Sequence, residues 1–264
     1  MHQVAFAETD SIPPKSLEHD ARLNDFEVVE FRRYTVKPGE RRHFAQYFEA
    51  WFPEAFQQLG AIAAGSFFER SNETGFTWIR AFHTIDDRAV ANAAFYYGSV
   101  WSEHRNVLNG LMTDSDNVLL LRPLRPDRGI MVLPAVDPVA EPSGAQGVML
   151  AQVFPVKKDQ VEAFAEEAEP AFARYRAAGA REAGVLVTLD VSNNFPQLPI
   201  RMDGPYLVWL GIVRDDKTVE QDLVPIVQQV AGTLSATMSL RGAPELILLD
   251  PTPRSRIRWL PSWK

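Results

Sequence analysis

Cysteine is absent from all 264 residues of the sequence. This absence excludes disulfides, thiolate metal sites, cysteine nucleophiles and iron–sulfur clusters. Long apolar runs are also missing, since none approaches the ~20 residues that a membrane-spanning helix needs. Basic residues are in the minority, and the net charge of −7 offers no general attraction for nucleic acid. The opening residues Met1-His2-Gln3 are not a basic region followed by an apolar stretch, so we expect a cytoplasmic protein with no membrane or nucleic-acid partner.

The common catalytic motifs are absent as well. The sequence has no phosphate-binding glycine loop, no G-x-S-x-G elbow, no H-E-x-x-H and no dinucleotide fingerprint. The five histidines all lie within the first 104 residues, and their spacing does not support a three-histidine metal site. We therefore expect no metal site and no cofactor, and any histidine-dependent chemistry must use the first part of the chain.

The order of the predicted elements indicates a ferredoxin-like module in residues 25–124. Residues 1–24 are polar and aperiodic and are expected to form an N-terminal arm. Alternating and three- or four-residue apolar spacings then predict strands at 26–36, 61–70, 76–85 and 117–124, with helices at 40–59 and from 86 onward. This β-α-β-β-α-β order is the ferredoxin-like arrangement.

The same order repeats in residues 148–252. Residues 125–147 contain four prolines and are interpreted as a linker, in which Ile130 to Leu133 pair briefly as a strand. Pro53 and Pro170 interrupt the first helix of each module at a similar depth, and an interior proline is costly enough to be informative. The tail 253–264 carries arginines and tryptophans and is expected to wrap a neighbouring module or subunit.

The run Glu30-Phe31-Arg32-Arg33-Tyr34-Thr35-Val36-Lys37-Pro38-Gly39 resembles the opening pattern of the NIPSNAP family, within the dimeric α/β-barrel superfamily. Phe82 with Asp86 to Ala89, and Trp101 on the second helix, extend the resemblance over 25–124. Around Trp78-Ile79-Arg80 the sequence departs from it, because Arg80 stands near the place of a family tryptophan.

The resemblance implies an α+β fold in which tandem ferredoxin-like βαββαβ modules form an α/β barrel, with helices outside antiparallel sheets. Relatives close such a barrel by dimerising, whereas two fused modules can close it within one chain. Assembly through other surfaces into a homo-oligomer is still expected.

The resemblance also implies an apolar pocket between sheet and helices, lined by Tyr34, Trp78, Arg80, Trp101 and His104. Strand alternation places Arg32 and Tyr34 on one face, and it places Trp78 and Arg80 together on the other side from Ile79 and His83. An arginine between aromatic residues either holds a carboxylate or enolate oxygen, or stacks on the rings and pairs with Glu30 or Glu69.

His104 lies on the predicted buried stripe of the second helix, which runs through Val90, Ala94, Tyr97 and Trp101. A buried imidazole needs a partner, so His104 is either a hydrogen-bonded core residue or a ligand-contacting one. The segment 192–204 is long for a hairpin connection, and we expect it to gate a pocket.

Two functional hypotheses follow from these residues. The first is a small-molecule enzyme of the cofactor-independent oxygenase or isomerase type that acts on an apolar substrate. In it His104 moves a proton and Arg80 or Tyr34 holds an oxyanion, while the substrate contacts Trp78, Trp101, Arg32 and His83. The alternative is a non-catalytic module that binds a small molecule, such as haem with His104 as axial ligand, or a protein.

Overall fold

The computed structural model describes residues 25–263, and the predicted arm 1–24 lies outside the described residues. The elements of the first half are β1 Val28–Val36, α1 Arg41–Gln58, β2 Ile62–Glu69, β3 Gly75–Phe82, α2 Ile85–Tyr96, α3 Ser99–Leu111 and β4 Met112–Pro123. Those of the second half are β5 Val148–Pro155, α4 Val161–Ala177, β6 Arg181–Thr188, β7 Tyr206–Val213, α5 Val224–Ser235 and β8 Glu245–Pro251.

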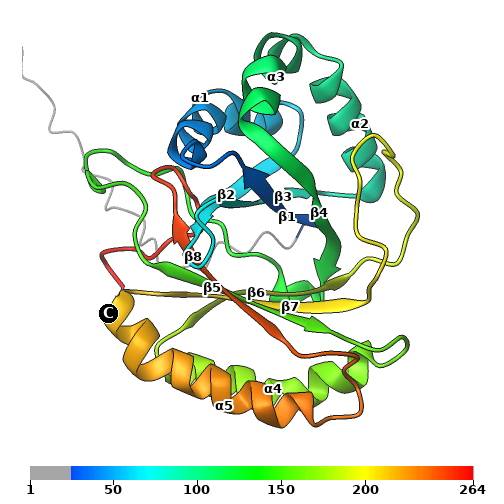
Figure 1. The fold of residues 1–264 in the computed structure, drawn as a ribbon, viewed down its shortest axis with the longest axis vertical. Coiled ribbons are helices and arrows are strands. Elements are labelled where there is room, and N and C mark those ends of the chain that lie inside the picture. Colours follow the sequence, from blue (N-terminus) through cyan, green and yellow to red (C-terminus); the bar gives the residue numbers. More distant parts are fainter. Residues whose placement is uncertain (1–24, 264) are drawn as a thin grey trace, which may run out of the picture.

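The strands form one closed antiparallel barrel in the order β1-β3-β2-β8-β5-β7-β6-β4. Each half contributes a four-stranded sheet, β4-β1-β3-β2 or β8-β5-β7-β6, and the two sheets join where β2 pairs with β8 and β4 pairs with β6. Helices α1, α2 and α3 cover one sheet and α4 and α5 cover the other (Figure 1). The chain thus has the dimeric α/β-barrel fold, and its two halves close the barrel internally, as the fused modules predicted.

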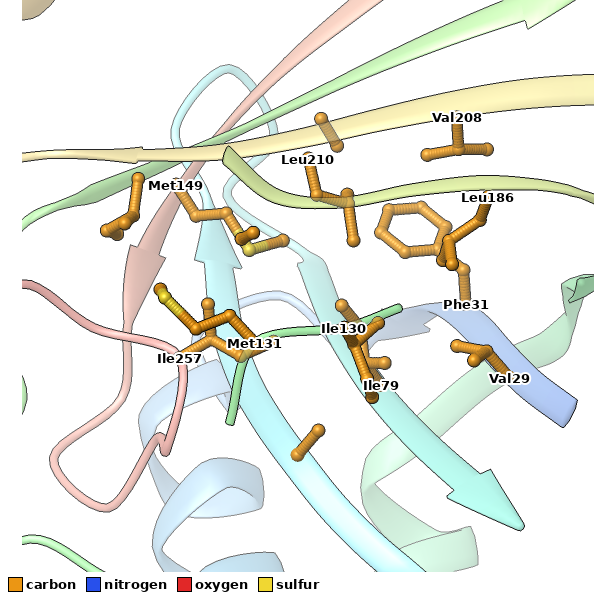
Figure 2. Close-up of a cluster of buried hydrophobic side chains, with 14 of the residues drawn as sticks. Val29, Phe31, Ile79, Ile130, Met131, Met149, Leu186, Val208, Leu210 and Ile257 are labelled. Atoms are coloured by element: carbon orange, nitrogen blue, oxygen red, sulfur yellow. The ribbon is translucent and has the colours of Figure 1, made fainter. Parts of the chain in front are cut away.

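The centre of the barrel is filled by the chain itself. Side chains that alternate along the strands point inward, and the buried segment 130–133 of the linker runs between the two sheets. Figure 2 shows Ile130 and Met131 lying between Ile79 on one side and Met149 and Leu210 on the other. The Met131 amide donates to the Ala183 carbonyl at 2.8 Å. The linker is therefore part of the core as well as a connection, and a ligand pocket must lie outside the barrel, between sheet and helices.

The C-terminal tail contacts both halves, with Trp259 against Arg181 of β6 and the Arg256 amide bonded to the Ala64 carbonyl of β2. Trp259, Leu260 and Trp263 join the cluster inside the barrel. The Arg254 amide donates to the Glu49 carboxylate on α1 at 2.9 Å, and the Arg254 guanidinium pairs with Glu54. The prediction that the tail wraps a neighbouring module is confirmed. Assembly into a homo-oligomer stays a prediction.

The second helical region divides at Gly98 into α2 and α3. Glycine suits this position, because a Cβ there would lie 2.4 Å from the Ala94 carbonyl oxygen. The expected buried stripe on its first part is wrong, since Val90 is 69% and Tyr97 is 70% exposed. The buried face of α2 instead carries Arg88, Ala91, Asn92 and Phe95. Because Arg88 and Asn92 on that face are polar, the apolar pattern of the sequence did not identify it as the buried face.

Two negative findings hold for the described part of the chain. No helix within residues 25–263 is long and apolar enough to cross a membrane. No group of three or more His, Asp or Glu side chains within the same residues is arranged to hold a metal ion.

The buried linker segment predicts a large stability effect. Ile130→Ala should lower the free energy of unfolding by about 2–5 kcal/mol, because it leaves a cavity in the barrel core. Val139→Ala in the same linker should change it by less than about 0.5 kcal/mol, since Val139 is exposed. Urea denaturation of the two variants measures the difference. Equal effects would mean that the segment does not fill the barrel.

Candidate functional site

One buried carboxylate gathers three buried arginines on the helix-facing side of the first sheet. The Glu30 carboxylate accepts from Arg32 and Arg80 at one oxygen and from Arg88 at the other, each at 2.6 Å. All four side chains are at most 1% exposed. The cluster follows from local geometry: Glu30 and Arg32 are two residues apart on β1 and share a face, while strand pairing sets Arg80 opposite Glu30. Arg88 comes from the first turn of α2.

The cluster carries an excess of positive charge. Burial alone would raise the pKa of Glu30, but the charges of Arg80, Arg32 and Arg88 outweigh it and hold that pKa well below its usual range. Arginine stays protonated in proteins, so one negative charge faces three positive ones. No other carboxylate of residues 25–263 pairs with these arginines. Burying an unpaired ion costs several kcal/mol, so the excess requires an explanation.

Several donors of the cluster lack partners. Within the described residues, both terminal nitrogens of Arg80, one of Arg88 and the indole Nε1 of Trp78 are buried without a hydrogen-bond acceptor. The Arg80 guanidinium lies 5.2 Å from the ring centroids of Phe56, Trp78 and Phe82. Such cation–π contacts offset about 0.5–2 kcal/mol each and explain how Arg80 is tolerated. They leave the Trp78 donor unsatisfied.

A pocket of about 100 Å³ adjoins the cluster, between the first sheet and α1, α2 and α3. Most of its walls are aromatic, and its polar side chains include Arg32, Tyr34, Trp78 and Tyr96; no Asp, Glu or His lines it. The Arg32 Nε donates to the Tyr34 hydroxyl at 2.8 Å. Burial raises the pKa of Tyr96, which keeps its phenol neutral. The pocket therefore presents donors and rings, without a carboxylate or imidazole.

A larger hollow of about 340 Å³ lies elsewhere, where β4 and β6 meet the start of α4. Its charged lining residues have both signs, including Arg122, Lys158 and Glu162, and none of its lining side chains has a buried unpaired polar atom. We place the candidate site at the smaller pocket because it adjoins the buried Glu30 cluster and Arg32 lines it.

Four of the predicted site residues, Arg32, Tyr34, Trp78 and Trp101, meet in this pocket. Arg80 does not line it. Its side chain is fully buried behind the wall, against Glu30 and the aromatic rings, which matches the alternative reading of a stacked and paired arginine. Arg80 can thus act on a ligand through its field but does not touch the pocket.

The two predicted site histidines lie elsewhere. His104 Nδ1 is 2.7 Å from the Tyr47 hydroxyl, and its ring stacks on Trp51 at a centroid distance of 4.2 Å, in the manner of a hydrogen-bonded core residue. His83 follows the end of β3 and is exposed, and its Nδ1 lies 2.9 Å from the Asp25 carbonyl oxygen. The structure therefore separates both from the pocket. Haem ligation by His104 within this pocket has no geometric support either, because no histidine of residues 25–263 lines the pocket and the His104 ring packs against Tyr47 and Trp51.

The segment 192–204 of the second half closes the pocket of the first. It rises beside α2 (Figure 1), where the Asn194 side chain accepts from Arg88 at 2.7 Å and donates to the Ile85 carbonyl at 2.5 Å. Phe195 packs near Tyr96, and Leu198 lines the pocket. Arg88 thus joins the lid to Glu30.

Sequence reasoning missed Arg88 and Tyr96 and considered Glu30 only as a pairing partner. The available signal for Arg88 was its spacing of seven residues before Phe95, which puts both on one helical face. The exposed apolar residues Val90 and Tyr97 pointed to the opposite face.

Comparisons with known proteins place the fold. No protein-family model matches the chain, and no curated protein matches its sequence. A provisionally assigned monooxygenase from Lactobacillus acidophilus NCFM has a TM-score of 0.55 and 13% identity, covering 86% of this chain and 94% of its own. An anthrone oxidase-like protein has a TM-score of 0.54 and 12% identity, covering 90% and 97%. At such identities the likeness shows the fold alone, here over nearly the whole length.

The NIPSNAP resemblance receives less support. A NIPSNAP family protein from Agrobacterium tumefaciens strain C58 matches 39% of this chain and 92% of its own at 18% identity, with a TM-score of 0.36. The match spans one half of the chain and carries no argument about function. The shared fold is therefore the dimeric α/β barrel, and membership of the NIPSNAP family stays a prediction.

The buried cluster predicts a pH-dependent stability. Glu30→Gln should lower the free energy of unfolding at pH 7 by about 3–5 kcal/mol, because it leaves three buried cations without their anion. Since the pKa of Glu30 is lower in the folded than in the unfolded chain, its stabilisation is complete above the ordinary value of 4.5 and is lost as pH falls below it.

The difference in the free energy of unfolding between wild type and Glu30→Gln, measured by urea denaturation, should therefore become smaller from pH 5 downward. Glu27→Gln, an exposed glutamate just before β1, is the matched control and should show no gap at any pH. A gap independent of pH would contradict the pairing.

Proposed function

We propose that this chain is a small-molecule enzyme of the cofactor-independent oxygenase or isomerase type that acts on an apolar substrate. The observation that supports it most is the aromatic pocket with Arg32 and Trp78 in its wall and excess positive charge behind it. Both reaction types pass through an enolate or phenolate oxygen. Donors fixed before the reaction stabilise such an oxygen best in a site that excludes water.

Each residue of the pocket and of the cluster behind it would have its own role. Arg32 and Tyr34, already hydrogen-bonded to each other, would hold the oxyanion. Trp78 and Trp101 would pack against the apolar body of the substrate. Arg80 and Arg88 would add positive potential without contact. The names of the two full-length structural neighbours, a provisionally assigned monooxygenase and an anthrone oxidase-like protein, agree with oxygen chemistry on such a fold.

Proton removal from the substrate is the step for which this pocket supplies no general base. The pocket wall offers no carboxylate or imidazole, so the predicted role of His104 finds no geometric support. The positive field would instead favour binding of the substrate as its anion, with the proton of an acidic C–H or O–H released to the solvent before the pocket closes. A ligand-binding protein without turnover is the second candidate, and the same lack of a general base favours it.

Oxygen uptake tests the proposal. Purified protein is supplied with single-ring phenols and enols in the presence of a chelator, and an oxygen electrode with product analysis follows the reaction. Tyr34→Phe should lower kcat/KM by about 10²-fold, the effect of losing one oxyanion donor.

Tyr175→Phe makes the same change at a buried tyrosine of the second half and should leave the rate unchanged. If no compound gives either oxygen uptake or an isomerised product, the ligand-binding candidate is favoured. Equal rates in the two variants would remove Tyr34 from the site.

A further inference from the structure

We propose that the pocket of the first half binds its ligand as a small organic carboxylate, with the anionic group on Arg32 and Trp78 and a single ring or short apolar group against the aromatic walls. The inference rests on the proposed function in placing the substrate in the same pocket. It concerns binding alone and does not require turnover.

The first support is the number of donors left free. An arginine has five N–H donors, and Arg32 uses one on Tyr34 and one on Glu30, with no further acceptor among residues 25–263. The Trp78 indole N–H has no acceptor there either. Both residues line the pocket, and the Arg32 guanidinium carbon lies 5.5 Å from the Trp78 ring centroid, so the two side chains are neighbours.

The second support is a comparison within the molecule. On β1 and β3, strand pairing sets Glu30 opposite Arg80 and Arg32 opposite Trp78. On β5 and β7, the same pairs are Leu150 with Gly211 and Gln152 with Trp209. The second half therefore has one tryptophan and no charged residue at these four positions. Its buried carboxylate, Glu182, lies on the neighbouring strand β6, opposite Gly211, and pairs with Arg128 and Arg176. The fold can thus form without Glu30, Arg32 and Arg80 at the matching places.

The second half also satisfies its own groups. The Trp209 Nε1 donates to Glu182 at 3.3 Å, and Gln152 accepts from Tyr175 at 2.8 Å. The Trp209 ring lies over Gly211, where a Cβ would come within 2.2 Å of it, and Phe172 stacks on the same ring. The place of Arg80 is thus filled by indole. Only the first of these two paired sites presents an unpaired donor to an adjoining pocket.

The chemistry of the walls narrows the class of anion. A carboxylate is planar and matches a guanidinium edge. Among the described residues, Arg32 is the one charged side chain that lines this mostly aromatic pocket, which suits a monoanion better than a doubly charged phosphate. The volume of about 100 Å³ admits one ring or a short chain. The lid residue Leu198 lines the same pocket and would cover the apolar end.

Isothermal titration calorimetry with three probes of one shape tests the proposal: benzoate, benzamide and benzylammonium. Benzoate should bind wild type at least about tenfold tighter than benzamide, the factor that one charge-assisted hydrogen bond supplies. Benzylammonium should bind more weakly than either. Arg32→Gln should remove the preference for benzoate and leave the affinity for benzamide unchanged.

Arg105→Gln is the control for net charge, because Arg105 is an exposed residue of α3, and this variant should keep the preference. Benzamide binding as tightly as benzoate, no binding by any probe, or benzoate binding unaltered by Arg32→Gln would overturn the proposal. Tighter binding of inorganic phosphate than of benzoate would overturn the assignment to carboxylates. Because the wild-type series needs no variant and no turnover, its failure is distinct from a failure of oxygen uptake.

Discussion

The pairing of Glu30 with three arginines is the constraint on which the first half depends. This carboxylate joins β1, β3 and α2 at one point, and through Arg88 it also reaches the lid 192–204. Removing it would leave three buried cations, so the cluster links stability to the geometry of the pocket. The same arrangement leaves an excess of positive charge, which a ligand of opposite sign can balance.

Closure of the barrel within one chain explains how the two halves came to differ. In a symmetric dimer each residue change would appear on both sheets, but here the sheets have separate sequences. The second half packs Trp209 over Gly211, while the first keeps Arg80 opposite Glu30 and a pocket beside it. The linker segment 130–133 fills the centre of the barrel and leaves the space between sheet and helices for binding.

The strands and their faces were predictable, and the helix faces were less so. Alternation along β1 and β3 was enough to group Arg32 with Tyr34 and Trp78 with Arg80, because a strand has only two faces. Arg88 was missed because the buried face of α2 was assigned from Val90 and Tyr97, which are exposed. The buried position of His104 followed from its helical spacing, but its partner did not. That partner, Tyr47, lies 57 residues away, and its contact depends on how α1 crosses α3, which no local pattern encodes. In the linker, the apolar run Ile130 to Leu133 was expected to pair briefly as a strand, and Met131 does bond Ala183. The surrounding prolines suggested a spacer, so the burial of this run in the core was not predicted.

Anomalous diffraction from crystals grown in bromide tests the central claim most directly, since a monatomic anion reports charge without shape. The account predicts a bromide within hydrogen-bonding distance of Arg32 and the Trp78 Nε1, and no bromide at the matching place between Gln152 and Trp209. An empty first pocket, or equal occupancy of the two halves, would contradict the claim that the first half alone is built to hold an anion.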